Sequence, residues 1–263
     1  MLPSNIANLD SLIQIKPTEK SQSDKNLHQS NLSQRNGELN RILGALPATE
    51  LEFLSEHLEL ILLPVGKMLY EPGEKLQHVY FPTTCIVSLH HVLASGGSVE
   101  IAGIGNEGMV GVTLIMGSNT MFISATVQIS GYAYKLNANV LLQEFNCNAK
   151  MQHLLLRYTQ KLIIQIGQAA ACNRHHNIRQ QLSRWLLLTL DRLPNDEMTV
   201  TQELMAFTLG VRRESVTEAA GILQREGLIS YRRGHITVIN RAELEHQACE
   251  CYFVIRNELR RCY

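Results

Sequence analysis

Residues 202–221, with the sequence QELMAFTLGVRRESVTEAAG, constrain the fold of this chain more than any other segment. Two short helices that cross at a tight turn need a small residue at the crossing, a glycine in the turn and apolar residues at fixed inward positions. Ala206 and Gly210 meet the first two requirements. The inward positions are all apolar: Met205, Leu209, Val211, Val216 and Ala219. The segment therefore predicts a helix-turn-helix, and an ordinary helical hairpin is the alternative.

The outer face of the second helix is suited to reading DNA. Arg213 can donate two hydrogen bonds to a guanine edge, and Glu214 can accept one from cytosine. Residues 228–239 predict two strands joined at Arg233-Gly234, a wing that can lie on the DNA backbone; a solvated hairpin without DNA contact is the alternative. We expect DNA contacts from Thr201, Gln202, Arg212, Arg213, Glu214, Ser215, Thr217, Glu218, Arg232, Arg233 and His235.

The charge of the chain is unevenly distributed. A formal net charge of zero, from 24 basic and 24 acidic side chains, argues by itself against a nucleic-acid binder. However, all eight lysines lie at or before Lys161, whereas thirteen of the sixteen arginines lie at or after Arg174. Residues 204–241 hold six arginines and three acids, a net charge of +3. Global neutrality therefore does not exclude DNA.

Residues 41–148 predict a β domain. Short apolar runs alternate there with turn signals such as Pro72-Gly73 and Gly96-Gly97, which is typical of a small antiparallel barrel or sandwich. No Lys or Arg occurs between Lys75 and Lys135, and the only acids in that stretch are Glu100 and Glu107. Because phosphate binding needs cations or aligned amides, we do not expect a phosphate to bind in this stretch.

Residues 149–173 contain no proline and predict one long helix. Alternating steps of four and three residues give one stripe that we expect to contact a second copy of the chain. This stripe consists of Met151, Leu155, Tyr158, Leu162, Gln165, Ala169 and Cys172. A second apolar stripe is expected to pack on the β domain: Leu156, Ile163, Ile166 and Ala170. The alternative is a helix buried within a single chain.

The whole chain is expected to be α+β, with an antiparallel, jelly-roll-like β-barrel sensor domain, a long dimerisation helix and a C-terminal winged helix-turn-helix. The predicted boundaries are 1–40 for a leader, 41–148 for the β domain with flanking helices, 149–173 for the helix and 174–263 for the C-terminal domain. The leader holds sixteen Ser, Asn and Gln residues and no aromatic residue, so we expect it to be mostly disordered.

This order of elements, and above all the motif at residues 200–229, resembles the Crp/Fnr family of bacterial transcription regulators. The resemblance implies a homodimer that binds palindromic DNA and contacts RNA polymerase, with the family's Arg-Glu pair at Arg213 and Glu214. Cyclic-nucleotide binders of the family carry Gly-Glu-Leu and then Arg-Ser or Arg-Thr, which match Gly108-Met109-Val110 and Ile123-Ser124 here. Met109 replaces the ribose-binding Glu, and Ile123 replaces the phosphate-binding Arg. We therefore predict a degenerate effector pocket that does not bind cyclic AMP or cyclic GMP in the family's usual way.

No cofactor is predicted, and the effector is unknown. The iron–sulphur members carry an N-terminal cysteine cluster, but the first cysteine here is Cys85. His78, His90 and His91 are possible haem ligands, although the adjacent pair would point to opposite faces of a strand. Two short groups contain metal-ligating residue types: Cys172, His175 and His176, and then His246, Cys249 and Cys251. Neither group alone has the paired spacing of a structural zinc site, so we predict no metal and expect free buried thiols; a redox role for Cys172 stays open.

The leading hypothesis is a cytoplasmic, sequence-specific regulator whose partners are double-stranded DNA, RNA polymerase and a second copy. No apolar run is long enough for a membrane helix, no secretory signal is visible, and six cysteines are too sparse for a disulfide scaffold. No G-x-S-x-G, P-loop or H-E-x-x-H motif indicates an enzyme. The alternative is a ligand-gated interaction module or regulatory subunit with a degenerate cyclic-nucleotide-binding barrel.

Overall fold

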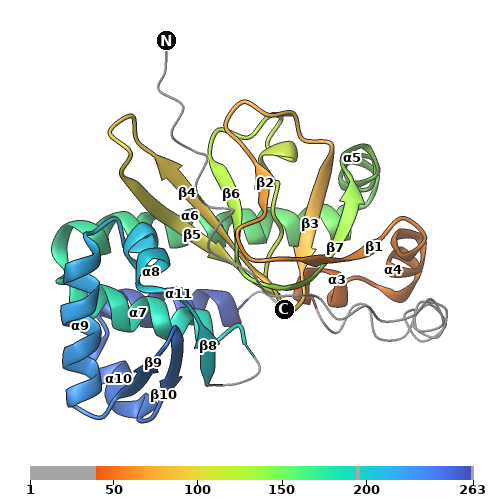
Figure 1. Cartoon of the computed structure of the whole chain (residues 1–263). Helices are drawn as coiled ribbons and strands as arrows, with labels where there is room; N and C mark the ends of the chain where they lie inside the picture. The colour runs from red at the N-terminus through yellow and green to blue at the C-terminus, as the bar shows by residue number, and fades with distance from the viewer. Residues whose placement is uncertain (1–39, 194–195, 262–263) are drawn as a thin grey trace, which may run out of the picture.

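The computed structural model describes residues 40–193 and 196–261 (Figure 1). The predicted leader, apart from Asn40, lies outside these residues. Asn40 is fully buried and caps the short helix α3 (Arg41–Gly44), while its Nδ2 donates to the carbonyls of Pro82 and Gly108. Helix α4 (Ala48–Ser55) follows. The start of the described chain is therefore fixed to the β domain by hydrogen bonds.

The β domain consists of two antiparallel sheets. One has the strand order β1 (Glu59–Leu63), β7 (Gly131–Asn137) and β3 (His78–Pro82). The other has the order β2 (Met68–Tyr70), β6 (Ser124–Ile129), β4 (Ile86–Val92) and β5 (Ser98–Ile104). A 3₁₀ turn, η1 (Val112–Leu114), lies between β5 and β6 in the sequence. The antiparallel prediction is confirmed, but the described strands form two sheets and no closed barrel.

The residues predicted to form a degenerate pocket are packed into the core of the β domain. Gly108, Met109, Val110, Ile123 and Ser124 are all buried. A Cβ atom at Gly108 would lie only 2.7 Å from the Tyr158 ring, and the Tyr158 hydroxyl donates to the Met109 carbonyl over 2.9 Å. Only a glycine allows the long helix to come this close.

That long helix is α6 (Ala149–His175), which follows α5 (Ala138–Cys147) and begins at the capping side chain of Asn148. Figure 1 shows it behind the sheets, reaching from the β domain to the C-terminal domain (residues 174–263). The helix was predicted, but the structure contradicts the roles given to its two stripes. Every residue of the stripe predicted to contact a second copy is buried within this one chain: Met151, Leu155, Tyr158, Leu162, Gln165, Ala169 and Cys172.

The second stripe, predicted to pack on the β domain, is instead largely exposed. The exposed fractions of Leu156 and Ile163 are 52% and 59%, and Ala170 is exposed as well. Only Ile166 of this stripe packs against the core. The prediction was wrong because both stripes have helical spacing, and the spacing alone does not say which one meets the sheets.

The C-terminal domain is built around Trp185 and the leucines of α7 (Ile178–Leu190), a helix that starts with a capping box of Asn177 and Gln180. The order after α7 is β8 (Glu197–Thr199), α8 (Gln202–Leu209), α9 (Arg213–Arg225), β9 (Ile229–Arg232), β10 (His235–Val238), α10 (Arg241–Gln247) and α11 (Glu250–Arg260). The three strands form one antiparallel sheet in the order β8-β10-β9. The wing is therefore a hairpin supported by a third strand.

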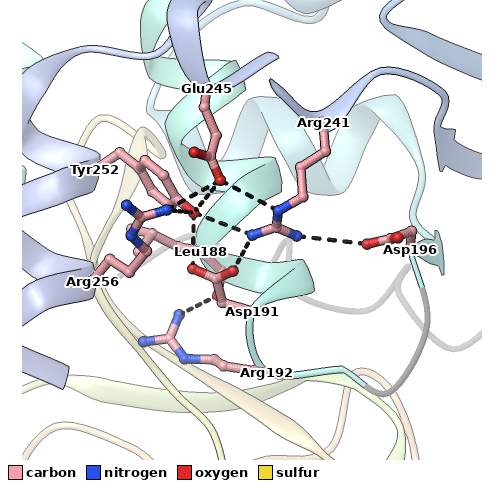
Figure 2. Close-up of polar contacts among 8 residues, drawn as sticks. All are labelled: Leu188, Asp191, Arg192, Asp196, Arg241, Glu245, Tyr252 and Arg256. Carbon is pink, nitrogen blue, oxygen red and sulfur yellow. Dashed lines mark hydrogen bonds and ion pairs between the residues drawn. The ribbon is translucent and has the colours of Figure 1, made fainter. Parts of the chain in front are cut away.

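A polar network holds the last helices of this domain together (Figure 2). Arg241, the first residue of α10, pairs with Asp191 at the end of α7 and lies 3.3 Å from Glu245. Arg256 of α11 lies 3.1 Å from the same Glu245, and the hydroxyl of Tyr252 donates to Asp191 over 3.1 Å. These contacts fix α10 and α11 against α7.

A buried ion pair joins the C-terminal domain to the β domain. Arg192 Nε lies 2.8 Å from Glu107 Oε1, and each side chain is only 5% exposed. Arg192 also donates to the carbonyls of Gly103, in β5, and Leu188, in α7 (Figure 2 shows the contact with Leu188).

None of the helices in residues 40–193 and 196–261 combines the length and the apolar character that a membrane-spanning segment needs.

Candidate nucleic-acid interface

Helices α8 and α9 have the geometry that the motif predicts. Thr201 caps α8 by accepting a hydrogen bond from the amide of Leu204 over 3.1 Å. The helix ends at Gly210, whose φ of 67° lies in the left-handed region that favours glycine. The predicted inward positions are buried, except for Val211, which is half-buried. The turn therefore presents α9 with one face in the core and the other in solvent.

The candidate DNA contacts lie on that outer surface. Nine of the eleven residues are exposed, and Gln202 and Ser215 are half-buried. The Arg213 guanidinium lies 2.9 Å from Glu203 Oε1 in an exposed ion pair, and Thr217 donates to Gln202 over 2.9 Å. Such exposed contacts are weak, so Arg213 can exchange its carboxylate partner for a base edge at little cost.

The N-terminus of α9 is open to an anion. Arg212 is the N-cap residue, and its side chain makes no capping hydrogen bond in the described part of the chain. The first amides of a helix have no partner within it and carry partial positive charge. Arg212 and Arg213 add two exposed cations at the same end. This arrangement suits a DNA phosphate.

The wing tip is a tight turn at Arg233 and Gly234. Their φ values are 50° and 82°, and Arg233 is the one non-glycine residue with positive φ within residues 40–193 and 196–261. Two positive φ angles are the signature of the type I′ turn that joins antiparallel strands. Arg232, Arg233 and His235 are exposed there. The turn therefore presents basic side chains to solvent at the tip of the hairpin.

The first helix of the motif rests on the β domain. Ser98 Oγ donates to the Phe207 carbonyl over 2.9 Å, and Gln128 Nε2 donates to Thr208 over 3.0 Å. The ring of His90 lies 4.9 Å from that of Phe207, and burial lowers the pKa of His90. Sequence reasoning missed this contact because its hydrogen bonds join residues 80 and 109 positions apart, and His90 and Phe207 are still farther apart in the chain.

The histidines considered as haem ligands lie in different surroundings. His90 is buried against Phe207, whereas its neighbour His91 is exposed, so the pair does point to opposite faces of β4. His78 is half-buried at the start of β3. The structure gives no shared pocket to His90 and His91.

The two cysteine-containing groups, by contrast, meet. Cys172 and His176 at the end of α6 lie beside Cys249 and Cys251 at the start of α11, with all four ligand atoms within 4.8 Å of one another. His175 and His246, the other members of the two groups, are exposed. Each group alone has too few ligand atoms close together to hold a metal ion. The packing of α11 on α6 brings two potential ligands from each group together.

Comparisons with known proteins agree with this architecture. Residues 180–247 match the family model of the Crp-like helix-turn-helix domain. The global nitrogen regulator of Synechococcus elongatus is 22% identical over 191 residues, which span 69% of this chain and 86% of the relative.

Solved structures share the fold. A structure described as that of a Crp/Fnr-family transcriptional regulator from Eubacterium rectale superposes with a TM-score of 0.62 at 15% identity, covering 78% of this chain and 96% of the other. FixK2 from Bradyrhizobium japonicum gives a TM-score of 0.62 at 16% identity, covering 73% and 98%. At these identities the likeness shows the fold alone.

Substituting Gly210 with alanine tests whether the motif rests on the β domain in solution. The left-handed backbone costs an alanine about 1 kcal/mol. The new Cβ would also lie 3.1 Å from the Ser98 carbonyl and 3.2 Å from Val99. Gly227→Ala is the matched control, because Gly227 also has positive φ but nothing within 4 Å of a Cβ. We expect chemical denaturation to show a larger loss of unfolding free energy for Gly210→Ala than for Gly227→Ala; equal losses would show that this contact is absent.

Proposed function

We propose that this chain is a transcription regulator of the Crp/Fnr family and that it binds a palindromic DNA site as a homodimer, with α9 as its recognition helix; the match of residues 180–247 to the Crp-like helix-turn-helix model and the likeness to the global nitrogen regulator support this. The exposed face of α9 carries this proposal. It presents Arg213, Glu214, Thr217 and Glu218 to solvent, while Val216 and Ala219 are buried beneath them. A recognition helix in the major groove needs such an exposed polar face toward the DNA and a buried apolar face toward its own domain.

Different parts of the proposed DNA-binding surface contact the bases and the phosphates. Arg213 and Glu214 have the chemistry to read a G·C pair, with the guanidinium on guanine and the carboxylate on cytosine. Arg212, the amides at the start of α9 and the wing residues Arg232 and Arg233 supply phosphate contacts. Two recognition helices would enter successive major grooves about 34 Å apart. Contact with RNA polymerase is proposed from the family resemblance.

Arg213→Ala tests the recognition helix. Loss of a bidentate contact to guanine should cost about 1–3 kcal/mol of binding free energy and weaken the preference for guanine at one base pair of each half-site. Arg225→Ala is the control, because it removes the same charge from the opposite, exposed end of α9. Site selection from random DNA followed by electrophoretic mobility assays measures both effects. An Arg213→Ala protein with unchanged affinity and preference would refute the assignment.

The proposed dimer contact is the exposed stripe of α6. Leu156, Ile163 and Ala170 repeat every seven residues, which is the spacing of a two-helix seam. Gly167 lies on the same side with nothing within 4 Å of a Cβ position, so a second helix can approach closely there. Large exposed apolar side chains on a long helix are costly in water unless a partner covers them.

Ile163→Glu should convert the dimer to a monomer, because it places two carboxylates against each other in an apolar seam. We expect DNA affinity to fall by about 100-fold or more, since two linked half-site contacts become independent. Met116→Glu is the control, as Met116 is similarly exposed at 62% but lies on the β domain. Sedimentation velocity reports the mass. If the Ile163→Glu protein remained a dimer, the contact between the two copies would not be the exposed stripe of α6.

We also propose that cyclic AMP and cyclic GMP are not the signal. Met109 is fully buried and Ile123 is 3% exposed, and both belong to the apolar core of the β domain. Neither side chain can bind a ribose hydroxyl or neutralise a phosphate. Tyr158 fills the space against Gly108, where a nucleotide would have to displace it.

Isothermal titration of either nucleotide into the protein should therefore give no saturable heat. The same preparation should bind its DNA site, which shows that the protein is folded and active. A saturable heat with one ligand per chain would contradict the proposal and would require Tyr158 to move out of the core.

A further inference from the structure

We propose that Cys172, His176, Cys249 and Cys251 form a mononuclear zinc site that joins the end of α6 to the start of α11. Three thiolates and one imidazole are a common ligand set of structural zinc sites. The sequence separates the two pairs by more than 70 residues, so no short motif reveals the set. The proposal does not depend on DNA binding, since it rests on these four side chains alone.

The distances fit one tetrahedral ion. Cys172 Sγ lies 3.5 Å from Cys249 Sγ, and Cys251 Sγ lies 3.7 Å from His176 Nδ1. Ligand atoms around zinc lie roughly 3.4–3.8 Å apart, given Zn–S bonds of about 2.3 Å and Zn–N bonds of about 2.0 Å. All four atoms already lie within 4.8 Å of one another, so small side-chain movements complete the site. A polynuclear iron–sulphur cluster would need more space, because several metal ions and sulphides would stand between the ligands.

A buried cation lies close to the four ligands. It is the guanidinium of Arg184, which interacts electrostatically with Cys172 and Cys249. Three thiolates around a divalent cation leave one net negative charge, which Arg184 can balance. A buried arginine near this cluster is otherwise costly.

His176 is oriented as zinc-binding histidines usually are. Its Nδ1 faces Cys251, while Nε2 lies 3.3 Å from the carboxylate of Glu250. A carboxylate on the second ring nitrogen fixes the tautomer and strengthens the metal bond. Gln181 in α7 donates to the His176 carbonyl over 2.8 Å and holds the backbone there. The structure thus supplies outer-shell partners as well as ligands.

The test uses the full-length protein, stripped with a chelator and refilled with Zn²⁺ or Co²⁺. We expect one zinc ion per chain by mass spectrometry. The cobalt form should show sulphur-to-metal charge transfer and intense visible bands of tetrahedral coordination. Cys249→Ser and Cys251→Ser should lose the bound ion, whereas Cys147→Ser, which alters an exposed cysteine in α5, should keep it.

Glu250→Gln is a second variant in case the cysteine variants fail to fold, because Glu250 is exposed, is not a proposed ligand and pairs with the outer ring nitrogen of His176. Its zinc affinity should fall by about 10-fold or more, with the tetrahedral cobalt spectrum preserved. Three outcomes overturn the proposal: no stoichiometric metal, an octahedral cobalt spectrum, or unchanged affinity in Cys249→Ser. A Cys172–Cys249 disulfide in protein purified under reducing conditions would also overturn it and would assign the pair to redox chemistry.

Discussion

The buried pair of Arg192 and Glu107 is the interaction on which the arrangement of the two domains depends. Two charges at 2.8 Å in a site closed to water attract strongly, but each would be costly without the other. Arg192 follows α7, the helix that carries the C-terminal core, and Glu107 belongs to the β domain. Separating the domains would break the pair and leave each charge either exposed to water or buried without its partner. The pair therefore fixes where the C-terminal domain sits more than it adds net stability.

This pair also explains the unusual charge pattern of the sequence. The stretch between Lys75 and Lys135 holds no cation and two acids, Glu100 and Glu107. Both acids lie close to arginines of the C-terminal domain: Arg192 pairs with Glu107, and Arg184 and Arg192 line the same pocket as Glu100. Burial raises the pKa of Glu100, and these two guanidinium groups oppose that shift. The arginine-rich end of the chain thus serves two purposes. Some of its cations are exposed at α9 and the wing, and others neutralise the acids of the β domain.

The parts of the fold that sequence reasoning predicted are those specified by local patterns. The turn at Gly210, the cap at Thr201 and the alternation of inward residues in α9 all lie within about 20 residues, so the motif is readable without its partners. The contacts that sequence reasoning missed join distant segments. Nothing near Ser98 indicates Phe207, and nothing near Cys172 indicates Cys249. The wrong assignment of the two α6 stripes has the same origin, because periodicity defines a face of a helix and long-range packing decides what covers that face.

Helix α7 is held at both of its ends, and this limits how a signal can act on the DNA-binding surface. Before its first turn lie Cys172 and His176 with the cysteines of α11, and after its last turn lies Arg192 with Glu107. Between them, α8 contacts the β domain through the exposed hydrogen bond of Ser98 with Phe207 and through the buried hydrogen bond of Gln128 with Thr208. A ligand shifts a two-state equilibrium only through contacts that differ between the states. Helices α7, α8 and α9 share one apolar core, so sliding α8 and α9 across α7 would break that core. A signal that repositions α8 and α9 must therefore move the C-terminal domain as one body and change the contacts that α8 makes with the β domain.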